Sequence, residues 1–250
     1  MSFVSLIKVW LLVVGAALAG PEEHLRAGND AYTAGDYAAA GESWGALLAD
    51  GHITGDVYYN LGNAWYRDGD LGRAVLSWRR AHTLLPRDGD VEANLERARR
   101  ETIDRMDAPS RVTPFFWTEM LSLSEQGHAA AWLIGLLLSL GVAQRVRPNL
   151  PLGIPGVMVG APAVLLAVGT WAGVRELNRT PAGVVLAEAV EVRSAAGDVA
   201  GVVVFELHAG AEVQIRERFG DYAQISLPDD RRGWIAEVEL GIVDPRLPMP

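Results

Sequence analysis

The side chains that could perform catalysis or bind a metal are few in this sequence and do not form a group. The histidines are scattered along the chain at positions 24, 52, 82, 128 and 208, and none has the spacing of a metal ligand set. The absence of cysteine excludes disulfides, thiolate metal sites, haem attachment through cysteines and a lipoprotein anchor. The sequence also lacks a nucleophile motif and a glycine-rich phosphate loop after a strand. We therefore expect no catalytic residue, no metal, no cofactor and no enzymatic activity.

A sequence repeat places polar and aromatic residues at regular intervals instead. Residues 55–88 repeat the pattern of residues 21–54. The matched pairs are Gly28 with Gly62, Asn29 with Asn63, Tyr32 with Tyr66, Gly35 with Gly69, Asp36 with Asp70, Ala40 with Ala74 and Trp44 with Trp78. In each unit a glycine-aspartate pair separates two helix-length stretches, and glycine tolerates the left-handed backbone of a tight turn. Each unit is therefore predicted to be a helix, a turn and a second helix.

The second unit resembles the tetratricopeptide repeat signature at almost every position. The matching residues are Tyr58, Leu61, Gly62, Trp65, Gly69, Ala74, Trp78, Ala81 and Pro86. Small Gly62 lets the two helices approach, large Trp78 fills the space between them, and Pro86 ends the second helix. We predict an all-α tetratricopeptide array over residues 21–108, closed by a charged capping helix over residues 89–105.

In the tetratricopeptide family, the first helix of each unit lines a concave groove that binds peptides. By resemblance, the groove here is lined by Asn29, Tyr32, Tyr59, Asn63, Tyr66, Arg67, Arg97 and Arg100. Some members clamp a terminal carboxylate with asparagines at the positions of Asn29 and Asn60, but Leu25 replaces the accompanying lysine. Asparagines there also bond helix backbones, which is the role that we favour. For the arginine cluster of the capping helix, Arg97, Arg99 and Arg100, we favour a solvated face over a ligand site.

Three apolar stretches interrupt the charged parts of the chain. Residues 1–19 are expected to be a signal peptide, with an uncleaved anchor helix as the alternative. Residues 128–144 and 150–174 are predicted to be two transmembrane helices that form a hairpin. Residues 109–127 would be an interfacial linker or an ordinary loop. Small residues four positions apart, such as Gly135 with Ser139 and Gly156 with Gly160, would let the two helices pack closely.

The charges predict where the parts of the chain lie. The net charge is −9 and no basic stripe is present, so we expect no nucleic-acid partner. The predicted turn between the apolar helices contains Arg145 and Arg147 but no acid, which favours the cytoplasmic side of the membrane. Together with the signal peptide, this predicts a bacterial inner-membrane protein with both soluble modules in the periplasm and contact with membrane lipid.

The last part of the chain has the pattern of a small β domain. Runs of β-forming residues are separated by Gly, Asp and Pro turns, at 190–193, 202–207, 212–216, 222–227 and 233–238. We predict an all-β barrel over residues 182–246, which resembles a bacterial SH3-type domain. Phe219, Tyr222 and Trp234 would form its ligand surface. A domain of this size also needs large aromatic residues for its core, which is the alternative role.

The order of these parts resembles the Bacteroides aerotolerance protein E family, known as BatE. The strongest shared string is residues 56–81, with Tyr59-Asn60-Leu61-Gly62-Asn63-Ala64 at its centre. The resemblance implies a periplasmic scaffold in an aerotolerance or envelope-stress complex. Its partners would be von Willebrand A-type proteins and other membrane proteins of the Bat operon. The alternative is an envelope sensor whose SH3-like domain binds peptidoglycan or a cell-wall peptide.

Overall fold

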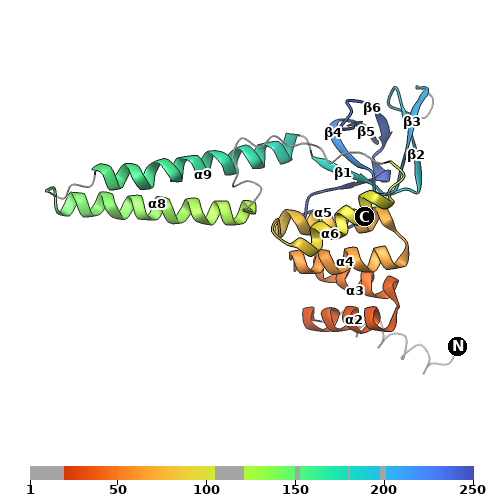
Figure 1. The fold of residues 1–250 in the computed structure, drawn as a ribbon, viewed down its shortest axis with the longest axis horizontal. Helices are drawn as coiled ribbons and strands as arrows, with labels where there is room; N and C mark the ends of the chain where they lie inside the picture. The colour runs from red at the N-terminus through yellow and green to blue at the C-terminus, as the bar shows by residue number, and fades with distance from the viewer. Residues whose placement is uncertain (1–19, 105–120, 150–152, 180, 198–200) are drawn as a thin grey trace, which may run out of the picture.

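The computed structural model describes residues 20–104, 121–149, 153–179, 181–197 and 201–250. It consists of a stack of helices, a helical pair that projects from the stack, and an antiparallel β-sheet (Figure 1). This mixed helical and β architecture confirms the prediction at the level of fold class. The expected signal peptide and residues 109–120 of the expected linker lie outside the described residues.

The helix stack is built from α2 (Pro21–Ala34), α3 (Tyr37–Ala49), α4 (Gly55–Asp68), α5 (Leu71–Leu84) and α6 (Gly89–Glu101). The predicted turns are confirmed. Gly35 and Gly69 have φ of 82° and 93°, which end α2 and α4 in the left-handed conformation. Asp36 and Asp70 then cap α3 and α5, because their side chains accept hydrogen bonds from backbone N–H groups three residues later.

The close packing predicted from the repeat is also present. A Cβ atom at Gly28 would overlap the indole of Trp44, and one at Gly62 would overlap the indole of Trp78. Both indoles are buried within the helix stack. The second helix of each unit therefore lies directly against a glycine of the first helix.

The projecting pair consists of α8 (Leu123–Val146) and α9 (Gly153–Arg179), which lie side by side (Figure 1). α8 begins before the predicted residue 128, because Ser122 and Glu125 form a reciprocal capping box. Residues 123–127 are thus helical and not part of a linker. A Cβ atom at Gly160 would contact Leu137, whereas a Cβ atom at Gly135 or Gly156 would meet no described atom within 4 Å, so the expected close contacts of these two glycines are not formed.

One described helix is long and apolar enough to cross a membrane, judged by length and composition. This is α8 over Ser124–Val146, with a mean hydropathy of 1.6. The apolar part of α9, Gly156–Ala172, is shorter. The membrane hairpin therefore stays a prediction.

The sheet has seven strands in the order β3-β2-β6-β5-β4-β1-β7. The bounds are β1 Ala182–Val185, β2 Ala189–Arg193, β3 Val203–His208, β4 Glu212–Phe219, β5 Tyr222–Ser226, β6 Arg232–Ala236 and β7 Leu240–Ile242, with a 3-10 turn at Glu237–Glu239. The five predicted strands are confirmed, and β1 and β7 are additional. Among the described residues no pairing closes β7 onto β3, so the sheet is open and the predicted closed barrel is not observed.

The sheet packs directly on the helix stack through α5, which contacts β1 and β7. Val184 of β1 and Val243, just after β7, are buried in the same hydrophobic cluster as the helix interior. All seven strands contribute residues to a second cluster, which includes Val213, Ile225 and Ile235. The helices and the sheet therefore share part of one core.

Candidate functional site

The predicted groove residues lie on the first helices of the units, as expected from their spacing. Tyr59, Asn63 and Tyr66 are four and three residues apart on α4 and share one face of that helix. Asn29 and Tyr32 lie on α2, and Arg97 and Arg100 lie on α6. The side chains of Asn29, Arg67, Arg97 and Arg100 are exposed, whereas the tyrosines and Asn63 are half-buried. The sheet contacts the stack through α5 and the end of α6, so it leaves these exposed side chains uncovered.

Two of the groove residues are held by neighbouring side chains. The Asn63 Oδ1 accepts hydrogen bonds from Trp78 Nε1 at 3.3 Å and from Asn94 Nδ2 at 3.0 Å. The Tyr66 hydroxyl donates to both carboxylate oxygens of Glu101, at 2.8 and 2.9 Å, and this interaction raises the pKa of Tyr66. Both residues therefore connect α4 to α6 and present a fixed surface.

The remaining groove residues are arranged more loosely. The Tyr32 ring packs against Tyr37 and Trp44, with ring centroids 5.2 and 5.7 Å apart. Arg100 forms an exposed ion pair with Glu96 at 3.4 Å. The face thus combines packed aromatic rings with charged side chains that can reorient.

The structure also brings together the three aromatic residues predicted as a ligand surface of the sheet. Tyr222 pairs with Phe219 across the β4–β5 turn, and Gln224, on the same face as Tyr222, pairs with Trp234. Phe219 is 70 % exposed, and the other two rings are half-buried. All three lie outside both buried clusters, so a core role does not account for them.

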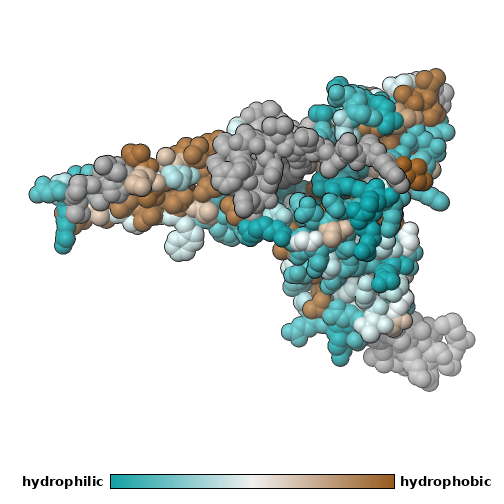
Figure 2. All heavy atoms as spheres, in the orientation of Figure 1, coloured by the Kyte–Doolittle hydropathy of each residue, from teal (hydrophilic) through white to brown (hydrophobic). Residues whose placement is uncertain are grey.

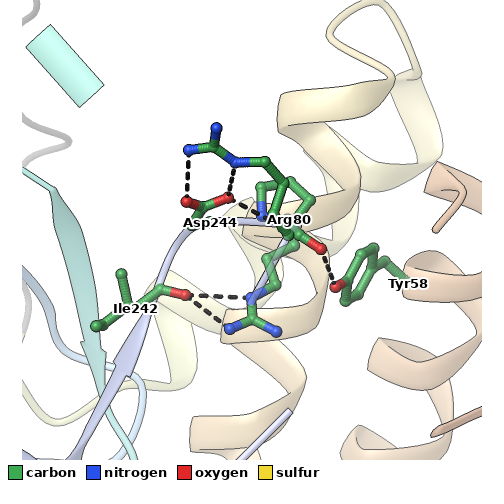
Figure 3. A network of polar contacts seen from close by, with 6 residues as sticks. Tyr58, Arg80, Ile242 and Asp244 are labelled. Atoms are coloured by element: carbon green, nitrogen blue, oxygen red, sulfur yellow. Dashed lines mark hydrogen bonds and ion pairs between the residues drawn. The ribbon is translucent and has the colours of Figure 1, made fainter. Parts of the chain in front are cut away.

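Sequence reasoning missed the contact between α5 and the last residues of the chain, which is drawn in Figure 3. Arg80, only 1 % exposed, donates two hydrogen bonds to the Ile242 carbonyl, at 2.9 and 3.1 Å. It also donates to the carbonyls of Leu247 at 3.0 Å and Pro248 at 3.3 Å. The Tyr58 hydroxyl donates to the Pro245 carbonyl at 2.7 Å. Burial lowers the pKa of Arg80 and raises the pKa of Tyr58.

A second polar cluster joins the helices to the sheet. Glu212 of β4 lies between Arg79 Nε at 3.1 Å and Arg99 Nε at 3.0 Å. At the end of α6, Asp104 accepts a hydrogen bond from the backbone N–H of His208 at 2.6 Å. Arg99 was expected to be part of a solvated face of the capping helix, but it is paired because the sheet covers this end of α6.

The described residues contain no group of His, Asp or Glu side chains that could hold a metal. The side chains that lie together here are aromatic rings, amides and arginines, and tyrosine and arginine are enriched among the residues that dominate protein–protein binding. No protein-family model matches the chain, and the search of curated proteins also gave no match.

Proposed function

We propose that the chain is a non-enzymatic scaffold anchored in the bacterial inner membrane, which binds a protein segment on the exposed face of α2, α4 and α6. We call this face the groove face, formed by Asn29, Tyr32, Tyr59, Asn63, Tyr66, Arg67, Arg97 and Arg100. The observation that carries the proposal is that side chains suited to binding recur on the alternate helices α2, α4 and α6, on a face that the sheet leaves open.

The physical support for binding is the mixture of rigid and mobile side chains on the groove face. Tyr66 is fixed by Glu101 and by packing on Trp78, with ring centroids 5.5 Å apart. A fixed aromatic ring gives a partner apolar contact area at low entropic cost. Arg67 and Arg97 are exposed, so they can form charged hydrogen bonds with a partner. This combination is typical of peptide-recognition surfaces.

Membrane anchoring is supported by the surface of α8 and α9. Ser124–Val146 would be about 34 Å long at 1.5 Å per residue, against about 30 Å of hydrocarbon. A core helix of a soluble protein would be buried, but Leu138, Val142 and Met158 are 67, 64 and 71 % exposed. Figure 2 shows hydrophobic residues along this arm and mostly hydrophilic residues on the stack and sheet. Such a surface is stable in lipid and costly in water.

The partner that we propose follows from the resemblance to the BatE family. The bound segment would belong to a von Willebrand A-type or other membrane protein of the Bat operon, in an aerotolerance or envelope-stress complex. Both soluble parts would lie in the periplasm, and the turn with Arg145 and Arg147 would lie in the cytoplasm.

Co-purification from detergent tests this function. The combined change Tyr66→Ala with Arg67→Glu should remove von Willebrand A-type partners, because it deletes a fixed ring and reverses a charge on the groove face. Glu42→Lys, an equally exposed change on α3, should retain them. If the double variant keeps every partner, the groove face does not bind them.

A second function is favoured by the aromatic row of Phe219, Tyr222 and Trp234. These side chains share one face of the sheet outside the buried clusters, so this face could bind peptidoglycan or a cell-wall peptide and make the protein an envelope sensor. Sedimentation of the intact chain with purified cell wall tests this, with Trp234→Ala as the variant. The intact chain is required because Val184 of the sheet is buried against the helices.

A further inference from the structure

We propose that Tyr58 and Arg80 form a second peptide-binding site, which residues 244–250 occupy in cis and which takes an extended, proline-containing peptide. This site lies on the side of the stack that faces β7, so it is separate from the groove face. The proposal does not depend on membrane anchoring or on the groove face.

This site recognises the backbone carbonyls of the bound segment. Arg80 and Tyr58 donate to the carbonyls of residues 242, 245, 247 and 248. Hydrogen bonds from a charged donor in a buried site are stronger than those between neutral groups. Carbonyl acceptors are common to all sequences, so the site selects an extended conformation more than particular side chains.

The bound segment has the composition that such a site requires. Pro245 is buried and Met249 packs against the helix core, whereas Arg246, Leu247 and Pro248 are exposed. The prolines at positions 245, 248 and 250 restrict φ and favour an extended chain before binding. Within the segment, Asp244 accepts three hydrogen bonds from Arg246, two at 2.9 Å and one at 2.8 Å, which reduce the freedom of the segment.

The occupant can be exchanged because few of its side chains are buried. From Asp244 onward the segment belongs to no strand, and it is held mainly by the donors of Arg80 and Tyr58. When the segment leaves, Arg80 keeps its two hydrogen bonds to the Ile242 carbonyl but loses the acceptors at residues 247 and 248, so N–H groups of a charged donor are left without protein partners. An empty site therefore favours any extended peptide that presents carbonyls at the same positions.

Fluorescence anisotropy with a labelled peptide of the sequence of residues 244–250 tests the site. A chain shortened after Val243 should bind the peptide saturably. The full chain should bind it at least about tenfold more weakly, because the tethered segment competes at high effective concentration. In the shortened chain, Arg80→Met should weaken binding by at least about tenfold, and Tyr58→Phe by about fivefold. Arg79→Met, one position away on α5, should leave binding unchanged because Arg79 faces Glu212.

Three results would overturn the proposal. The first is loss of helical circular dichroism in the shortened chain, since residues 244–250 would then be an inseparable part of the fold. The second is equal binding by the Arg80→Met variant. The third comes from the otherwise unchanged full chain, in which Met249→Cys would be the only cysteine and can carry a dye. Excess unlabelled peptide should shift the dye signal toward that of a freed segment, and an unchanged signal would contradict exchange.

Discussion

Among single residues, Arg80 makes the most consequential contact between the helices and the sheet. Its guanidinium reaches the carbonyl of Ile242 at the end of β7 and two carbonyls of the following segment. A buried arginine is stable only when its donors are satisfied, so this residue holds the end of β7 on α5 and binds the segment that follows. Tyr58, on α4, supports the same segment from the neighbouring helix.

Replacement of this arginine should destabilise the fold. Arg80→Met replaces the guanidinium with an apolar thioether of similar length and leaves the carbonyls without their donors, so we expect a loss of about 2 to 4 kcal/mol of unfolding free energy. Urea unfolding followed by circular dichroism measures it. Arg246→Met, at an exposed position, should change stability by less than about 0.5 kcal/mol. A similar effect of the two changes would mean that the buried contact contributes little.

A methyl group at the helix crossing should also be costly. Gly62→Ala places a Cβ atom inside the Trp78 indole, so we expect about 1 to 3 kcal/mol of destabilisation from overpacking. Gly45→Ala on α3 has open space around the new atom and should stabilise by up to about 1 kcal/mol. Thermal unfolding of both variants gives the comparison. Stabilisation by Gly62→Ala together with destabilisation by Gly45→Ala would refute the close packing of Gly62 against Trp78.

Contacts within a repeat unit could be predicted from the sequence, whereas contacts between the helices and the sheet could not. Gly62 and Trp78 were predictable because their partners lie within one repeat unit, where spacing determines contact. Arg80 was not predictable, because its acceptor Ile242 is 162 positions away in the chain. Nothing in local composition marks α5 as the helix that receives the sheet.

At the scale of elements, the missed and shifted boundaries have physical causes. β1 and β7 have only four and three residues, too few to give a clear pattern in the sequence. They are ordered by pairing, because β1 pairs with β4 on one side and with β7 on the other. The early start of α8 was visible in the sequence, since Ser122 and Glu125 have the spacing of a capping box. The hydrophobic pattern alone placed that helix start too late.

The contact between α5, α6 and β4 should make stability depend on pH. Burial, together with the nearby arginines 79 and 99, lowers the pKa of His82 below its ordinary value of 6.5, and the acids Glu92 and Glu212 oppose this only in part. The folded state therefore favours neutral His82, whereas the unfolded chain takes up a proton at about pH 6.5. The stability gained from neutral His82 is fully present above about pH 6.5 and is lost as the pH falls through and below this value.

Thermal unfolding between pH 7.5 and 5 measures the effect. The His82→Asn variant should lose about 3 °C less than the unchanged chain over this range. His52→Asn, at an exposed position, should follow the unchanged chain. Identical pH profiles for all three proteins would contradict a role of His82 in this contact.

For the molecule as a whole, the parts were predictable but not their assembly. The repeat period predicted the helix stack, and alternating β-forming runs predicted five strands. The sheet packs on α5 through Val184, Val243 and Arg80. Nothing in the sequence around these residues marks them as contact residues, because they come together only in the folded chain. The helices and sheet consequently form one body from which the α8–α9 pair projects (Figure 1).

The proposed membrane hairpin predicts on which side of the membrane each part of the chain lies. Because the chain has no cysteine, single cysteines report accessibility without background. Glu188→Cys, in an exposed loop of the sheet, should react with a membrane-impermeant maleimide in intact spheroplasts, and Asn149→Cys, in the turn after α8, should react only after lysis. Labelling of both positions before lysis would contradict the hairpin.

The central claim is that the groove face binds a membrane-protein segment, and in-cell photo-crosslinking tests it most directly. A photoreactive amino acid is placed at Arg67 on the groove face or at Glu42 on α3, both exposed. The account predicts a discrete adduct with a von Willebrand A-type membrane protein from position 67 and none from position 42. The same adduct from both positions, or no adduct from position 67 in cells that contain the partner, would contradict it.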